Sequence, residues 1–279
     1  AIKPDYIEAC YNLGIVFMGL DQLDEAVKSY EKALILKPNY AEAHYNLGIA
    51  FKKLDQLDAA VECYEKAIAI KPDYAEAHNN LGNVLNDLGQ LDDAVKSYEK
   101  ALALKPDYAE AHYNLGNAFK ELGQLDDAIK SYKKALALKP DYAEVHNNLG
   151  NAFKELGQLD ESVKSYEKAL TLKPDNANMH NNLGGVFMEL GQMDDAAKRF
   201  GKAVTLRPDY AEAYYNLGKA LVWLGQKDEA VKSFEKALSI NPEYVKVYRQ
   251  LGAIKKYTAS DPQITQMQSL LSTNNLSQS

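Results

Sequence analysis

Apolar residues recur along the chain at the spacing of two short amphipathic helices, and residues 109–142 show one copy of the pattern. The first stripe contains Ala111, Leu115, Ala118, Phe119 and Leu122, and the second contains Ala128, Ile129, Tyr132, Ala135, Leu136 and Leu138. Both have the 3.6-residue period that places side chains on one face of an α-helix. The pattern therefore predicts a hairpin of two helices whose apolar faces pack together.

Residues with special backbone preferences mark the ends of these two helices. Asp107 is a favoured N-cap residue, and Glu110 three positions later can complete a capping box. Gly123 can take the left-handed conformation that ends a helix, Asp126 is placed to cap the second helix, and Pro140 stops it. Two helices with short connections are therefore expected.

Glycine and proline each recur every 34 residues along the chain. The glycines are Gly14, Gly48, Gly82, Gly116, Gly150, Gly184, Gly218 and Gly252, and the prolines are Pro4, Pro38, Pro72, Pro106, Pro140, Pro174, Pro208 and Pro242. A fixed period of this length is typical of a solenoid, in which each unit buries apolar surface on its neighbours. A glycine inside a helix costs about 1 kcal/mol relative to alanine, so we expect the partner helix to approach closely at Gly116.

The spacing of seven residues in this hairpin resembles the tetratricopeptide repeat pattern. They are Leu115, Gly116, Phe119, Ala128, Tyr132, Ala135 and Pro140. The resemblance implies an all-α fold, a right-handed α-solenoid superhelix of 34-residue helix-turn-helix units. Seven complete units are expected at 7–40, 41–74, 75–108, 109–142, 143–176, 177–210 and 211–244. Residues 1–6 are expected to end a preceding unit, 245–271 to form a partial eighth repeat with a closing helix, and 272–279 to be a linker-like tail.

Composition narrows the classes of partner. The net charge is −7 and the isoelectric point about 5.4, whereas nucleic acids and anionic membranes attract clustered Lys and Arg. No apolar run approaches the roughly 20 residues that span a bilayer. Cys10 and Cys63 lack metal-type spacing, so we expect reduced thiols, which favours the cytoplasm. We expect no nucleic-acid binding, no membrane insertion and no cofactor.

All five histidines occupy one position of the repeat. They are His44, His78, His112, His146 and His180, and the same position holds Cys10, Tyr214 and Tyr248 in other units. Neighbouring helices pack about 10 Å apart, whereas zinc ligands lie about 2 Å from one ion. No Ser or Cys lies one helical turn from these histidines on the same face. We interpret the histidines as packing residues, and we expect no metal site, no catalytic residues and no enzymatic activity in this chain.

A column of asparagines is the strongest candidate for a binding surface. It comprises Asn12, Asn46, Asn80, Asn114, Asn148, Asn182 and Asn216, with Gln250 in the eighth unit. Asparagine is a poor helix-interior residue, so its recurrence needs a reason. The amides either hydrogen-bond the neighbouring unit or face the concave groove and bind a peptide backbone, and both can hold. The phrase "NNLGN" resembles the superhelix of the O-linked N-acetylglucosamine transferases, which implies the peptide-binding role. Asn83, Asn117 and Asn151, one turn away, can widen the polar strip.

The sixth unit departs most from the pattern, with Gly185 and Gly201 inside its helices. Beside it we expect Met188, Tyr215, Val222 and Trp223 to share the groove side. An exposed patch of Met and aromatic residues is typical of a partner's anchor point. The alternative is that the C-terminal tail of the chain covers this patch. In the tail, Ile264, Met267 and Leu271 fall on one helical face.

Taken together, these patterns predict a non-catalytic scaffold that binds a protein or an extended peptide in the concave groove. One alternative is a substrate-recruiting domain of a larger transferase, because the tail resembles the junction in bacterial proteins that carry such repeats ahead of a sulfotransferase domain. Another is a self-assembling array, since the first helix, predicted at residues 7–20, is expected to expose an apolar face that allows end-to-end association.

Overall fold

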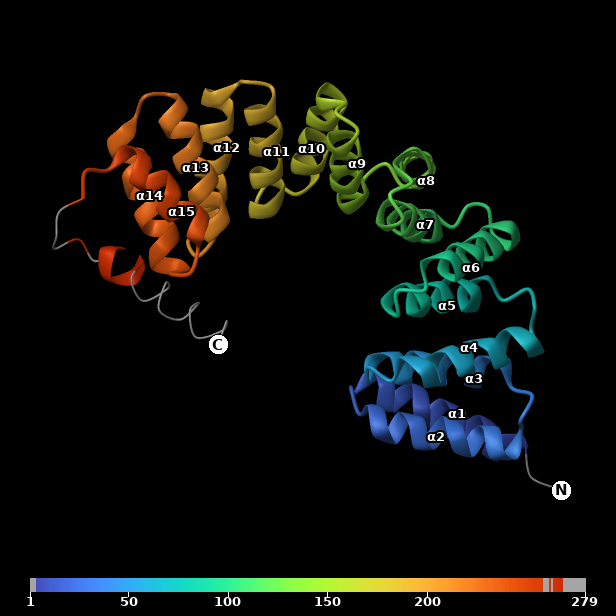
Figure 1. The fold of residues 1–279 in the computed structure, drawn as a ribbon. Coiled ribbons are helices and arrows are strands. Elements are labelled where there is room, and N and C mark those ends of the chain that lie inside the picture. Colours follow the sequence, from blue (N-terminus) through green and yellow to red (C-terminus); the bar gives the residue numbers. More distant parts are fainter. Residues whose placement is uncertain (1–3, 258–260, 262, 268–279) are drawn as a thin grey trace, which may run out of the picture. The chain divides into compact units, whose positions relative to one another are not determined.

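The computed structural model describes residues 4–257, 261 and 263–267. These residues form fifteen labelled helices and a short helical stretch at 263–267, without any strand (Figure 1). The contacts divide the chain into an N-terminal part, Ala1–Pro140, and a C-terminal part, Asp141–Ser279. The all-α prediction is confirmed.

The N-terminal part contains four helical hairpins. Its helices are α1 (Pro4–Gly19), α2 (Leu23–Leu36), α3 (Ala41–Lys53), α4 (Leu57–Ile70), α5 (Ala75–Asp87), α6 (Leu91–Leu104), α7 (Ala109–Glu121) and α8 (Leu125–Leu138). Each odd-numbered helix packs on the even-numbered helix that follows it, and α2, α4 and α6 also pack on the first helix of the next hairpin. This stacking is that of an α-solenoid.

The C-terminal part continues the same alternation. Its helices are α9 (Ala143–Glu155), α10 (Leu159–Leu172), α11 (Ala177–Glu189), α12 (Met193–Leu206), α13 (Ala211–Trp223), α14 (Lys227–Ile240) and α15 (Val245–Ile254). The odd-numbered helices from α3 to α13 begin where the 34-residue period predicts that each unit starts. We call the odd-numbered helices first helices and the even-numbered ones second helices.

Each hairpin closes with an aromatic ring against the mid-helix glycine of its first helix. A Cβ atom added to Gly116 would lie 2.5 Å from Cε1 of Tyr132, which is buried. The same contact joins the pairs Gly14–Tyr30, Gly48–Tyr64, Gly82–Tyr98, Gly150–Tyr166, Gly184–Phe200 and Gly218–Phe234. The expected close approach at Gly116 is confirmed, and the ring explains why a glycine is needed.

The predicted aspartate caps are wrong. The residue that caps α7 is Tyr108 and the one that caps α8 is Gln124, and neither side chain makes a capping hydrogen bond. Asp107 therefore lies before the cap of α7, and Asp126 lies inside the first turn of α8. There its negative charge is favoured by the helix dipole without a capping hydrogen bond. The predicted ends are confirmed: Gly123 has φ +73°, and α8 stops before Pro140.

At the N-terminal end, α1 begins at Pro4, within the residues 1–6 that the sequence predicts to end a preceding unit. That assignment stays a prediction. Proline is tolerated in the first turn of a helix, where its missing N–H costs nothing. The predicted linker at 272–279 and Leu271 lie outside the described residues.

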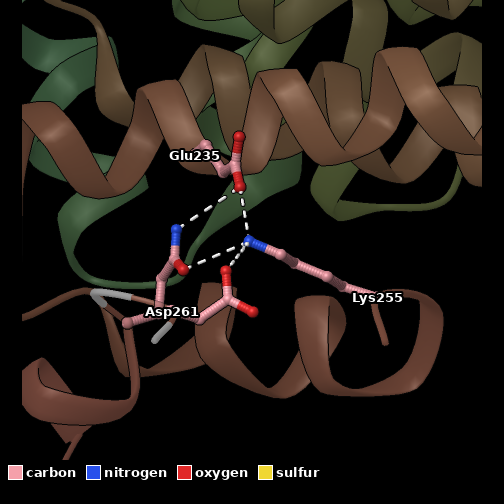
Figure 2. A network of polar contacts seen from close by, with 4 residues as sticks. Glu235, Lys255 and Asp261 are labelled. Carbon is pink, nitrogen blue, oxygen red and sulfur yellow. Dashed lines mark hydrogen bonds and ion pairs between the residues drawn. The ribbon is translucent and has the colours of Figure 1, made fainter. Parts of the chain in front are cut away.

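A short segment after α15 is held by a polar network around Lys255. Lys255 Nζ lies 2.8 Å from Glu235 Oε1 of α14 and 3.0 Å from Asp261 Oδ1 (Figure 2). It also donates to Gln263 Oε1 at 3.2 Å. The hydrogen bond to Glu235 raises the pKa of Lys255. Met267 then packs against the apolar cluster of α13, α14 and α15.

Candidate functional site

The asparagine column links consecutive first helices in the N-terminal part. The Nδ2 atom of Asn46 donates to the Tyr11 hydroxyl at 2.8 Å, and that of Asn80 donates to the Tyr45 hydroxyl at 3.0 Å. Asn114 Nδ2 donates to Oδ1 of Asn79 at 3.1 Å. Each bond therefore runs to the residue that precedes the asparagine of the previous hairpin. One of the two predicted roles, hydrogen bonding to the neighbouring unit, is confirmed for these three residues.

The C-terminal part repeats this link incompletely. Asn216 Nδ2 donates to Asn181 Oδ1 at 3.1 Å, which joins α13 to α11. At the step from α9 to α11, Oδ1 of Asn147 is buried and has no hydrogen-bond partner among the described residues. This link is thus missing at the first helix of the sixth unit, the unit that departs most from the sequence pattern.

The residue that precedes each column asparagine decides what that asparagine can still bind. In the third hairpin, Asn79 Nδ2 donates to Asn80 Oδ1 at 3.4 Å, and in the fifth, Asn147 Nδ2 donates to Asn148 Oδ1 at 3.1 Å. In the second and fourth hairpins this preceding residue is Tyr45 or Tyr113, which has no amide to donate. The column is uniform in sequence and has two kinds of member in the structure.

Three further predicted asparagines have a packing role. Oδ1 of Asn83 accepts a hydrogen bond from the Tyr98 hydroxyl at 2.8 Å, and Asn117 accepts one from Tyr132 at 2.8 Å. Asn151 accepts the hydroxyl of Tyr166 in the same way. In the sixth and seventh hairpins the tyrosine is replaced by Phe200 or Phe234, and the asparagine by Gly185 or Lys219. Their amide oxygens therefore satisfy buried hydroxyl groups, which limits how far these asparagines widen a binding strip.

Tyrosine rings surround the column. Tyr11 packs on Tyr40 with ring centroids 4.9 Å apart, and Tyr45 packs on Tyr74 at 4.8 Å. Burial raises the pKa of Tyr11 and of Tyr45, so both are neutral hydroxyl groups at physiological pH. The last residue of nearly every unit is a tyrosine, and this recurrence in the sequence could have indicated that these rings lie beside the column. The residues are Tyr40, Tyr74, Tyr108, Tyr142, Tyr210 and Tyr244.

Charged pairs frame these rings. Lys71 Nζ lies 4.5 Å above the Tyr74 ring and 3.8 Å from Glu42 Oε1. Lys105 lies above the ring of Tyr108 and 3.2 Å from Glu76. The strip is thus half-buried, aromatic and polar, with its neighbouring charges largely paired.

The histidines are packing residues that fasten the loop between hairpins. The Nε2 atom of His44 lies 2.9 Å from the Pro38 carbonyl oxygen, and that of His112 lies 3.0 Å from the Pro106 carbonyl. His78 and His180 contact Pro72 and Pro174 in the same way. In the eighth unit the Tyr248 hydroxyl donates to the Pro242 carbonyl at 2.8 Å, so tyrosine can serve the same purpose. Burial lowers the pKa of His44, His112 and His180.

The histidines lie on the side of the first helices opposite the column, because two residues correspond to about 200° of helix rotation. There His44, His78 and His112 line open grooves between successive second helices. The groove between α2 and α4 contains His44 and has a volume of about 610 Å³, and the one between α6 and α8 contains His112 and has about 720 Å³. Across the part of the chain that the structure describes, no three His, Cys, Asp or Glu residues come together as a metal site.

The predicted patch beside the sixth unit is only partly exposed. Trp223, the last residue of α13, is 73% exposed. Met188 and Val222 are half-buried against separate apolar clusters. Tyr215 is 9% exposed because Phe234 and Tyr244 pack on its ring, so the prediction that it belongs to an exposed patch is wrong. Trp223 is thus the one large exposed side chain of the four.

None of the described helices combines the length and the hydrophobicity needed to cross a membrane. Comparison with known sequences matches the family described as TPR repeat to residues 20–55, 51–86, 82–123, 116–157, 150–191 and 184–225. The family described as tetratricopeptide repeat matches residues 211–244. No curated protein matches the chain.

Solved structures share this fold. The chain is 29% identical to MamA, with a TM-score of 0.56 over 60% of this chain and 97% of MamA. It is 24% identical to YrrB, a TPR protein with an unusual peptide-binding site, with a TM-score of 0.60 over 68% of this chain and 98% of YrrB. A tetratricopeptide repeat protein from Parabacteroides merdae ATCC 43184 is 20% identical, with a TM-score of 0.66 over 90% of this chain and 100% of that one.

Proposed function

The chain belongs to the tetratricopeptide repeat family, and we propose that it is a non-catalytic scaffold that binds an extended segment of another protein. The binding surface is the strip of first-helix faces that carries the asparagine column, within each part of the chain. The observation that carries this proposal is the half-buried row of tyrosine hydroxyls and asparagine amides. Such groups donate to and accept from a peptide backbone whatever the side chains of the ligand.

The free energy of one hydrogen bond determines how many units of this strip must contact a ligand. A micromolar ligand needs about 8 kcal/mol of binding free energy, and a net hydrogen bond supplies about 0.5–1.5 kcal/mol. Several units must therefore contact the ligand together, and the tyrosine rings add apolar contact area. YrrB shares the fold and has a peptide-binding site, but at 24% identity this likeness extends only to the fold. The proposal rests on the chain's own residues.

Site-specific photo-crosslinking tests where a protein ligand binds. A benzoylphenylalanine at Lys120 of α7 lies two turns from Tyr113 on the same helix face, because seven residues complete almost two turns. The matched control is the same group at Lys100, an exposed residue of α6 beside the histidine-lined groove. We expect bound polypeptide to crosslink at position 120 and not at position 100. Equal crosslinking at both positions, or crosslinking at 100 alone, would contradict the proposed surface.

Self-association is a second candidate function, which one observation favours. On α1, Leu13 is 48% exposed and Val16 is 55% exposed, whereas the equivalent Leu47 of α3 is 5% exposed under α2. This face is complementary to the apolar side of a second helix, and a second copy of the chain can supply one. We expect light scattering to detect association at high concentration that Val16→Lys reduces. The control Lys28→Glu, at an exposed position of α2, should leave it unchanged. A wild-type chain that stays monomeric under these conditions would exclude this candidate.

A further inference from the structure

We infer that the asparagines of the column divide into ligand-binding and purely structural members, and that Asn46 and Asn114 accept backbone N–H groups of the bound polypeptide. Asn80, between them, only holds the stack together. The inference rests on the proposed function, and it names the atoms through which that function operates in the N-terminal part.

The hydrogen bonds that these asparagines make within the chain distinguish the two kinds of member. Asn80 uses both ends of its amide: Nδ2 donates to the Tyr45 hydroxyl, and Oδ1 accepts from Asn79 Nδ2. Asn46 and Asn114 use Nδ2 to bond the preceding hairpin, to Tyr11 and Asn79 respectively. No donor reaches their Oδ1 atoms among the described residues, because each follows a tyrosine. Their side-chain carbonyls are therefore acceptors that the fold itself does not engage.

The tyrosine of the second hairpin completes a pair of complementary groups. The Tyr45 hydroxyl accepts from Asn80, which leaves its own proton available to donate. Tyr45 and Asn46 thus offer one donor and one acceptor from the same first helix, Tyr45 toward the following hairpin and Asn46 toward the preceding one. In the third hairpin, Asn79 accepts from Asn114 and donates to Asn80, so its bonding groups are directed into the stack.

The spacing of the two acceptors fits an extended chain. Packed helices lie about 10 Å apart, so Asn46 on α3 and Asn114 on α7 are separated by about 20 Å. An extended polypeptide rises about 3.3 Å per residue, which corresponds to roughly six residues between the two contacts. Successive N–H groups of an extended strand point to alternate sides, so groups an even number of residues apart lie on the same edge. One edge of a single strand can therefore reach both carbonyls.

Binding of an unbiased peptide pool tests the division. The probe is a fluorescent pool of random-sequence 15-residue peptides, and the readout is anisotropy at a temperature where every variant is folded. We expect Asn46→Ala with Asn114→Ala to weaken binding on the order of tenfold, since two hydrogen bonds are lost. Asn80→Ala should leave the affinity within about twofold of wild type while lowering the melting temperature. A second pool with N-methylated backbones should bind wild type and the double variant equally weakly.

The outcomes separate this inference from the proposed function. If wild type does not bind the random pool at all, both the proposed surface and the inference fail. If wild type binds but Asn80→Ala weakens binding as much as the double variant does, the column is uniform and only the inference fails. If the double variant binds as tightly as wild type, the carbonyls of Asn46 and Asn114 do not contact the ligand, and the inference is likewise wrong.

Discussion

The second hairpin, α3–α4, and the third, α5–α6, share the same helical arrangement and the same glycine–tyrosine contact, yet the side chains beside their column asparagines differ. Both bury a tyrosine against a glycine, and both carry a column asparagine and a histidine. In the second hairpin Tyr45 precedes Asn46, whereas in the third Asn79 precedes Asn80 and donates to it. The residue that precedes the column asparagine therefore decides the state of its side-chain carbonyl. After a tyrosine the carbonyl can still accept a hydrogen bond, whereas after an asparagine it already accepts one within the chain.

Substitution of the glycine that packs against the buried tyrosine should give the largest effect on stability, and the effect should be equal in both hairpins. A Cβ at Gly48 would lie 2.8 Å from Cε1 of Tyr64, and one at Gly82 would lie 2.6 Å from Cε1 of Tyr98. Overpacking a core costs about 1–3 kcal/mol, part of which the better helix propensity of alanine offsets. We expect Gly48→Ala and Gly82→Ala each to lower the free energy of unfolding, measured by urea titration. Gly201→Ala, with no atom within 4 Å of the added Cβ, is the control and should stabilise. Unchanged stability in both core variants would contradict the packing account.

Loss of the hydrogen bonds between hairpins should give the next largest effect on stability. We expect a double-mutant cycle of Asn80→Ala and Tyr45→Phe to report a coupling of about 0.5–1.5 kcal/mol, the value of one net hydrogen bond. The same cycle for Asn46→Ala and Tyr11→Phe should give a similar value, because the two bonds are 3.0 and 2.8 Å long. Zero coupling in denaturant unfolding for both pairs would mean that the column does not link the hairpins.

The turns inside the two hairpins sharpen the comparison further. The second hairpin turns at Asp55 with φ +59°, whereas the third turns at Gly89 with φ +74°. A side chain in this left-handed conformation costs roughly 1 kcal/mol relative to glycine. We expect Asp55→Gly to raise the free energy of unfolding by up to about 1 kcal/mol, and Gly89→Asp to lower it by a similar amount. Changes of the opposite sign in thermal or urea unfolding would refute this assignment.

Histidine protonation should give the smallest effect. Burial lowers the pKa of His44 in the folded chain, so the unfolded chain binds a proton more readily. The stability that this histidine contributes is complete above its unfolded pKa of about 6.5 and falls as the pH drops through the lower folded value. We expect His44→Tyr, which copies the residue found at Tyr248, to reduce the loss of stability between about pH 6.5 and 5. An identical pH profile for variant and wild type would show that His44 does not titrate on unfolding.

Period and packing were readable from the sequence because they depend on local spacing. The 34-residue interval predicted where α3, α5, α7, α9, α11 and α13 begin, and Gly116 predicted the close approach of the partner helix. The helix caps were not predictable from the residue preferences of aspartate, since Tyr108 and Gln124 cap α7 and α8 without a side-chain hydrogen bond.

The division of the column needed the structure for a similar reason. Asn114 bonds Asn79, which lies 35 residues earlier, and no local pattern states that contact. The same holds for Asn83, whose partner Tyr98 lies on the second helix of its hairpin. Sequence periodicity identifies equivalent positions, but the hydrogen bonds that consume each side chain are set by its neighbours in space.

Exchanging the residues that precede the column tests the central claim most directly. Tyr45→Asn should place an amide donor on the Asn46 carbonyl, and Asn79→Tyr should release the Asn80 carbonyl. With the random-sequence peptide pool and all variants folded, we predict weaker binding for Tyr45→Asn and tighter binding for Asn79→Tyr, each by roughly two- to tenfold. Affinities that do not change, or that change in the same direction in both variants, would contradict the claim that open asparagine carbonyls bind the ligand.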